Sequence, residues 1–160
     1  MKLFLIALCT HLFCLPAFAQ DVPSIKAKAL AQLYNQPNDS IYVINFWATF
    51  CKPCIEEMPY LQSIAAKYAS QKVQLLLVSV DQKSVYPTQL KTFVNTHQIS
   101  APVLWLNETN ADYFCPIIDE KWSGSIPATL FIKPSTGKRI FVEAELTEKE
   151  FETTLNKMIQ

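Results

Sequence analysis

Two cysteines separated by two residues are the most reactive feature of this sequence. Cys51 and Cys54 lie in the segment NFWATFCKPCIEEMP, residues 45–59, where a hydrophobic and aromatic run precedes them. The same C-x-x-C spacing occurs in zinc ribbons and in dithiol oxidoreductases. The pair could bind a metal, close a structural disulfide or carry out redox chemistry, so the surrounding residues have to separate these possibilities.

The residues around Cys51 favour redox chemistry. Attack on a disulfide requires a thiolate, whereas a free cysteine is mostly protonated at neutral pH. The sequence predicts that Cys51 lies at the start of a helix, where free N–H groups and the helix dipole stabilise an anion. Lys52 adds a nearby positive charge. We therefore expect Cys51 to be the attacking thiol and Cys54, one turn later, to be the resolving thiol.

A zinc site would need more ligands than this pair. A closed structural zinc site uses four Cys or His ligands, generally as two close pairs. Beyond residues 1–19 the chain offers this pair, the lone Cys115 and the lone His97, so all four would have to converge. Copper(I) transfer through the two thiolates of Cys51 and Cys54 needs fewer ligands and is the better metal alternative.

The first nineteen residues, MKLFLIALCTHLFCLPAFA, have the order of a secretory signal peptide. Lys2 opens a leucine- and phenylalanine-rich run, and Pro16 and A-F-A close it. The run is short for a membrane span, which argues against a retained anchor. We expect residues 1–19 to be a signal peptide cleaved after Ala19, with residues 20–160 exported to the periplasm as one domain.

The composition is that of a folded globule. Half of the 160 residues are apolar, and 14 basic residues balance 14 acidic ones. Such a balance gives no support for a nucleic-acid partner. Export would place the cysteines outside the cytosol, where disulfides persist.

Strand and helix patterns alternate along residues 20–160. Apolar residues at helical spacing predict helices at 24–35, 53–68, 88–98 and from 147 to the C-terminus. Apolar runs predict strands at 41–47, 72–80 and 102–107, whereas 108–122 is weakly helical or irregular. Strands at 128–132 and 139–143 flank a Pro/Gly turn, which predicts a hairpin. The predicted fold is α/β, with a mixed central sheet, helices on both faces and a C-terminal hairpin plus helix.

Pro127 stands at the start of the first hairpin strand, in the segment SGSIPATLFI. Proline at a strand edge is common and needs no function. A cis Ile126–Pro127 bond beside the dithiol would instead leave backbone groups free to pair with an extended substrate. Only about 5–6% of X–Pro bonds are cis, so the sequence leaves both readings open.

The segment FWATFCKPCIEEMP, followed about seventy residues later by SIPATLFI, resembles the thioredoxin superfamily. The resemblance is specifically to the extracytoplasmic TlpA/ResA-like thiol-disulfide oxidoreductases, and it covers most of residues 20–160. It implies a thioredoxin fold, a redox-active Cys51–Cys54 disulfide, no cofactor and no bound metal. It also implies a monomer that reduces disulfides of envelope proteins, with a role in cytochrome c maturation. Its electrons would come from a membrane dithiol donor such as a DsbD-like protein.

The resemblance also assigns roles to single residues. Pro127 matches the cis-proline that faces the dithiol, and Glu57 matches an acidic residue that influences thiol ionisation. Glu57 could equally be a solvated carboxylate that interacts favourably with the helix dipole. We expect the substrate to contact the surface around the dithiol and the proline, formed by Phe50, Lys52, Pro53 and Ile126.

Two positions depart from the pattern or lie outside it. Asn45 stands where cytosolic thioredoxins carry a buried aspartate, and because an amide cannot shuttle a proton, Glu57 or water would have to serve as a base for Cys54. Cys115 has no counterpart in the family. It is either a small buried hydrophobe or a third redox thiol that could bridge to another chain.

Two other functions remain open at this point. One is a copper(I) chaperone that uses Cys51 and Cys54, with His97 as a further ligand. The other is a thioredoxin-fold interaction protein in which the cysteine pair is vestigial.

Overall fold

The strand that leads to the cysteine pair, β2 (Ile41–Trp47), lies in the interior of a six-stranded sheet. The computed structural model describes residues 20–160, and the predicted signal peptide lies outside the described residues. β2 pairs in parallel with β3 (Val73–Ser79) along seven residues and antiparallel with β5 (Ala128–Lys133) on its other side. Its nearly continuous apolar sequence suits this position, because both of its faces are covered.

Three further pairings complete the sheet in the order β1-β4-β3-β2-β5-β6. β4 (Val103–Leu106) is parallel to β3, and the two-residue β1 (Ser24–Ile25) is parallel to β4. β6 (Lys138–Val142) is antiparallel to β5 and forms the predicted hairpin with it. The turn of the hairpin contains Gly137 at φ +67°, a backbone conformation that glycine adopts without a steric penalty.

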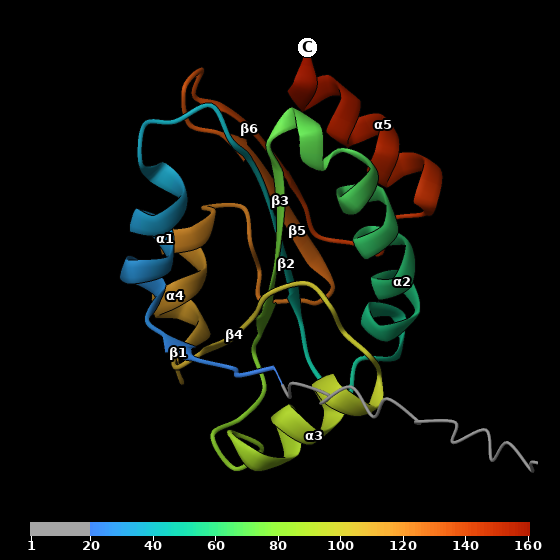
Figure 1. Cartoon of the computed structure of the whole chain (residues 1–160). Coiled ribbons are helices and arrows are strands. Elements are labelled where there is room, and N and C mark those ends of the chain that lie inside the picture. Colours follow the sequence, from blue (N-terminus) through green and yellow to red (C-terminus); the bar gives the residue numbers. More distant parts are fainter. Residues whose placement is uncertain (1–19) are drawn as a thin grey trace, which may run out of the picture.

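Helices cover both faces of this sheet (Figure 1). α1 (Ala27–Asn35) and α4 (Ala111–Ile118) lie on one face, and α2 (Lys52–Lys67) and α5 (Glu148–Ile159) lie on the other. α3 (Thr88–Thr96) lies near the end of the sheet at which α2 begins, and a short 3₁₀ turn, Ala69–Gln71, links α2 to β3.

A separate apolar layer fills each side of the sheet. Leu61 of α2 and Phe151 of α5 belong to the layer that also contains Cys51 and Cys54. The layer beneath α1 and α4 includes Leu30, Phe114 and Cys115. The predicted fold class is confirmed: a mixed sheet carries helices on both faces and ends in a hairpin and a helix.

One local prediction needs correction, and one open alternative is decided. The segment predicted as a helix at 24–35 begins as the strand β1, and α1 starts only at Ala27. The reason is tertiary, because Trp105 and Asn107 donate backbone hydrogen bonds to Pro23 and Ile25 and draw this segment into the sheet. The segment 108–122, expected to be weakly helical or irregular, contains the regular helix α4, where the Asn110 side chain caps the start by accepting the Asp112 N–H at 3.0 Å.

Within residues 20–160, no helix combines the length and the apolar character needed to cross a bilayer.

Candidate active site

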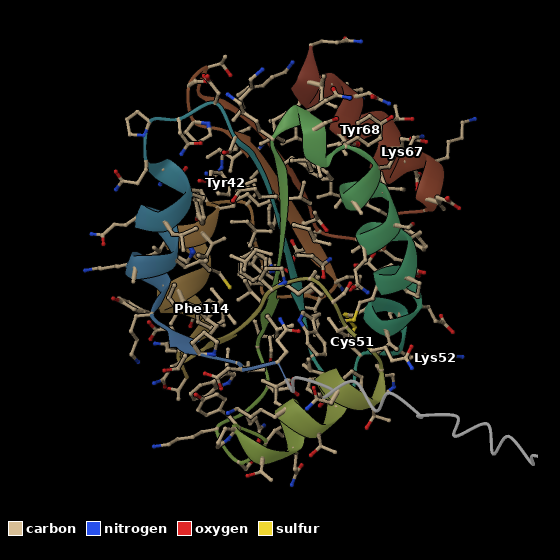
Figure 2. The ribbon with its side chains drawn as sticks, viewed as in Figure 1. Tyr42, Cys51, Lys52, Lys67, Tyr68 and Phe114 are labelled. Carbon is tan, nitrogen blue, oxygen red and sulfur yellow. A yellow bond between two sulfur atoms is a disulfide. The ribbon has the colours of Figure 1, made fainter. Side chains whose placement is uncertain are left out.

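Cys51 forms the N-cap of α2, directly after the turn that leaves β2. Its N–H donates to the Ala48 carbonyl oxygen at 3.0 Å, which closes that turn. Cys51 and Cys54 are joined in a disulfide, with their Cα atoms 5.3 Å apart. The Cys54 N–H donates to Cys51 Sγ at 3.3 Å, so a free N–H of the first helical turn is directed at this sulfur. The predicted position of Cys51 at a helix start is therefore confirmed, and Figure 2 shows its sulfur at that end of α2.

The two cysteines differ in exposure. Cys51 is 7% exposed, whereas Cys54 is completely buried. A reagent in solution can therefore reach only Cys51 directly. This asymmetry fits an attacking thiol at Cys51 and a resolving thiol behind it.

Lys52 contributes little to the electrostatics of the pair. Its side chain points outward from the helix (Figure 2), is 85% exposed and approaches Glu56 at 3.6 Å. Exposed charges of this kind interact weakly because water screens them. The helix N-terminus is therefore the main source of positive potential at Cys51.

Asp81 connects the loop before Cys51 to the end of β3. Its carboxylate accepts the Thr49 N–H at 3.1 Å and the Thr49 hydroxyl at 2.7 Å. The Ser79 hydroxyl donates to the same carboxylate at 2.8 Å, and the Trp105 indole N–H donates to the Asp81 carbonyl at 2.8 Å. Sequence reasoning missed this buried aspartate. The available signal was its position directly after the strand predicted at 72–80, because the carboxyl ends of parallel strands meet at one edge of a sheet.

Glu57 is completely buried, so the alternative of a solvated carboxylate is wrong. Its Oε1 accepts a hydrogen bond from Asn45 Nδ2 at 2.6 Å, and its Oε2 accepts one from the Leu146 N–H at 3.2 Å. Burial raises the pKa of Glu57 to about 7, although both hydrogen bonds act in the opposite direction. Glu57 can therefore exchange a proton near neutral pH, one helical turn beyond Cys54.

Pro127 lies at the end of the sheet that carries the cysteines. Phe46 of β2 pairs with Ala128 of the antiparallel strand β5, so Pro127 is level with the end of β2. From that end of β2 the chain continues to Cys51. The Ile126–Pro127 peptide bond is cis, and the pairing of its backbone groups with a substrate stays a prediction. Ile126 packs against the apolar layer that contains both cysteines.

Apolar side chains near Cys51 reach the surface to different degrees. Phe50 is 75% exposed, an unusual position for a large aromatic side chain. Pro53 and Ile126 are half-buried. These residues and Lys52 are the ones predicted to contact a substrate, and that contact stays a prediction.

Cys115 lies on the opposite side of the sheet from the cysteine pair. It is 3% exposed within the layer beneath α1 and α4, and burial, assisted by Glu143 and Asp112, raises the pKa of its thiol to about 11. A thiol in this state is a weak nucleophile. The reading of Cys115 as a small buried hydrophobe agrees with its position.

His97 follows the last residue of α3, and its ring stacks on Phe93 with centroids 3.8 Å apart. Its Nδ1 lies 3.0 Å from the Phe93 carbonyl oxygen. Among residues 20–160, no group of three or more His, Cys, Asp or Glu side chains is arranged to hold a metal ion.

Comparison with known proteins gives a consistent family assignment. Residues 14–137 match the model of the AhpC/TSA family. The thiol-disulfide oxidoreductase ResA of Oceanobacillus iheyensis is 33% identical over 114 residues, which cover 71% of this chain and 55% of that protein. The ResA protein of Bacillus thuringiensis strain Al Hakam is 31% identical over 116 residues, or 72% of this chain and 61% of that protein. The chain thus aligns with less than two thirds of the length of these relatives.

The architecture matches solved structures as well. A thiol:disulfide interchange protein of the thioredoxin family from Chlorobium tepidum TLS superposes with a TM-score of 0.62 at 18% identity. The superposition covers 90% of this chain and 100% of that protein, which shows a shared fold. The chain therefore has the thioredoxin fold and belongs to the AhpC/TSA family, which confirms the resemblance read from its two motifs.

Proposed function

We propose that this protein is a thiol-disulfide oxidoreductase that reduces disulfides of other proteins through Cys51 and Cys54. The observation that carries this proposal is the asymmetry of the pair. Cys51 is accessible at a helix N-terminus and receives the Cys54 N–H, whereas Cys54 is buried one turn behind it. The curated relatives are named thiol-disulfide oxidoreductases, which supports thiol-disulfide exchange through this pair.

The reaction transfers two electrons from the reduced pair to the substrate. The Cys51 thiolate attacks one sulfur of the substrate disulfide, which forms a mixed disulfide and releases the other sulfur as a thiolate that takes a proton from water. The Cys54 thiol then transfers its proton to the Glu57 carboxylate. The resulting thiolate attacks Cys51 Sγ, forms the Cys51–Cys54 disulfide and releases the second substrate thiolate.

The partners and the location belong to this proposal too. The predicted signal peptide supports export to the periplasm, where protein disulfides are available as substrates. A membrane dithiol donor such as a DsbD-like protein would restore the reduced pair. Apocytochrome c is the substrate class that the family resemblance favours, and the protein would act as a monomer.

Reduction of insulin by residues 20–160, with dithiothreitol as electron donor, tests the activity. Cys51→Ser should abolish the protein-dependent rate because no mixed disulfide can form. Reduced Cys54→Ser protein, freed of dithiothreitol and mixed with insulin, should accumulate a mixed disulfide that is visible on a non-reducing gel. Cys115→Ser is the matched control and should keep the rate, since its side chain lies across the sheet from the pair. An unchanged rate in Cys51→Ser would contradict the proposal.

The reduction potential, measured in graded glutathione buffers, tests the direction of electron flow. A value near or below roughly −230 mV supports a reductant, whereas a value near −120 mV would make the protein an oxidant. Failure to form the disulfide, together with stoichiometric copper(I) binding, would favour the copper chaperone instead.

A further inference from the structure

Asn45 is a polar residue in the most buried strand of the sheet. It is completely buried, and its neighbours in β2 are the apolar Ile44 and Phe46. Its Nδ2 donates to Glu57 Oε1 at 2.6 Å and to Thr129 Oγ1 at 3.1 Å. Both hydrogens of the amide group are therefore used.

The other end of the same amide has no partner. Asn45 Oδ1 is buried and makes no hydrogen bond within residues 20–160. A buried acceptor without a partner is unfavourable, and an apolar side chain of similar size would avoid this cost. The useful contribution of Asn45 is therefore its donor group, and that group is directed at Glu57.

Thr129 fixes the direction of this donor. Asn45 and Thr129 are directly paired residues of the antiparallel strands β2 and β5. With one amide hydrogen bonded to the Thr129 hydroxyl, the other is held toward the carboxylate. The contact is short, at 2.6 Å, and an amide N–H binds an ionised carboxylate more strongly than a neutral carboxyl group.

Among residues 20–160, the groups that act on Glu57 include no positively charged side chain. Cys54 lies one turn earlier on α2, and Tyr60 lies nearly one turn later. Glu145 acts on Glu57 from the segment before α5, where the Leu146 N–H is the second donor. From the sheet, β2 and β5 place the neutral side chains of Asn45 and Thr129 on the side of Glu57.

We propose that Asn45 is a positioning residue that stabilises the charged, proton-accepting form of Glu57 and so sets the pH at which the Cys54 thiol is activated. This inference rests on the proposed function, in which Glu57 takes the Cys54 proton. A hydrogen bond to the charged form of an acid lowers its pKa, so loss of the Asn45 donor raises the pKa of Glu57. At any pH below that pKa, a smaller fraction of Glu57 can then accept the proton.

Resolution of a mixed disulfide measures this step directly. The reduced protein with Cys115→Ser as background is mixed with 5,5′-dithiobis(2-nitrobenzoate), and Cys51 forms the adduct in a first phase. Attack by Cys54 releases a second thionitrobenzoate, and the rate of this phase is followed by absorbance across pH 5 to 9. The unmodified site should give a rate that rises with pH and levels off once Glu57 is ionised.

Asn45→Leu should move this inflection to higher pH by about one unit, which makes the rate below the inflection about tenfold slower. The plateau at high pH should change by less than about threefold, because Glu57 is ionised there in both proteins. Thr129→Val keeps the donor to Glu57 and should shift the inflection by less than half as much. An inflection that stays in place in a folded Asn45→Leu protein overturns the inference.

Asn45→Val provides a second test if Asn45→Leu does not fold, because a β-branched apolar residue suits a buried strand. It removes the same donor without adding a titratable group, so the inflection should again move to higher pH. An unmoved inflection in this variant also overturns the inference.

Glu57→Gln separates this inference from the proposed function. It should remove the inflection, and Asn45→Leu should add no shift in that background. If Glu57→Gln keeps the original pH profile, the role of Glu57 in the proposed function is wrong. If Glu57→Gln removes the inflection while neither Asn45 variant moves it, only the role of Asn45 is wrong.

Discussion

At the scale of single residues, Glu57 shows how burial changes the meaning of a side chain. A carboxylate near a helix N-terminus is ordinarily stabilised in its charged form. Here the side chain is completely buried, and desolvation raises its pKa to about 7 despite two hydrogen bonds. The group therefore opposes folding when it is charged, and this has a measurable consequence for stability.

Glu57→Gln should change the pH dependence of the free energy of unfolding. Between the unfolded pKa of about 4.5 and the folded pKa of about 7, the unfolded chain has lost the Glu57 proton while the folded chain keeps it. Stability from this group is thus fully present below pH 4.5 and is lost as the pH rises to 7. The loss is roughly 3 kcal/mol. The free energy of unfolding, measured in urea at several pH values, should fall less between pH 4.5 and 7 in Glu57→Gln than in the parent protein.

Glu56→Gln is the matched control for this measurement. Glu56 is the preceding residue on α2, and its side chain is 56% exposed in a loose pair with Lys52. Replacing this exposed side chain should leave the fall in the free energy of unfolding between pH 4.5 and 7 the same as in the parent protein. An equal decline in the parent and in Glu57→Gln would show that Glu57 does not titrate in this range.

At the scale of elements, the site depends on segments that meet at the first turns of α2. The chain leaves β2 and continues to Cys51 at the start of α2. Asp81, just beyond β3, binds Thr49 in the loop before Cys51. The segment before α5 donates the Leu146 N–H to Glu57. Leu146 directly precedes Thr147, the N-cap of α5. The start of α5 therefore helps to position a group of the site that lies 89 residues earlier in the chain.

Thr147→Ala should destabilise the protein by about 1 kcal/mol. Thr147 and Glu150 form a capping box, in which the Thr147 hydroxyl accepts the Glu150 N–H and the Glu150 carboxylate accepts the Thr147 N–H. The substitution leaves a helix N–H without its side-chain acceptor. The free energy of unfolding in urea measures the loss.

Thr153→Ala, at an exposed position inside the same helix, is the control for this substitution. It makes the same chemical change but removes no cap, and alanine is the better helix former. Its stability should equal or slightly exceed that of the parent. Equal losses in the two variants would mean that the capping box does not stabilise α5 in this protein.

At the scale of the whole molecule, the sheet separates two apolar layers with different roles. The layer under α2 and α5 holds the cysteine pair, and the layer under α1 and α4 holds Cys115. The sheet thus keeps a buried third thiol away from the redox pair. Stability depends on how tightly the helices pack on these layers.

Leu61→Ala should lower the free energy of unfolding by about 2–5 kcal/mol. Leu61 is completely buried on the face of α2 that packs against the sheet, so its truncation leaves a cavity. Leu33→Ala makes the same change on α1, where the side chain is 42% exposed, and should cost less than about 1 kcal/mol. Urea unfolding compares the two variants, and similar losses in both would contradict this assignment of the core.

The sequence by itself indicated redox chemistry at the pair and determined the class of the fold. The strand before Cys51, the helix after it and the terminal hairpin follow from patterns that span fewer than about twenty neighbouring residues, because periodicity and turn chemistry are local. The C-x-x-C spacing and the expected helix start together indicated a thiolate at Cys51. Contact of the substrate with Phe50, Lys52, Pro53 and Ile126 remains a prediction.

Only the tertiary structure decided which side chains surround the pair. Glu57 accepts a hydrogen bond from the Leu146 N–H, 89 residues away, and the direction of the Asn45 amide depends on Thr129, 84 residues away. β1 became a strand because β4 pairs with it, against the helical spacing of its sequence. Such contacts join segments distant in the chain, and burial, which sets the pKa of Glu57 and of Cys115, exists only once those segments have packed together.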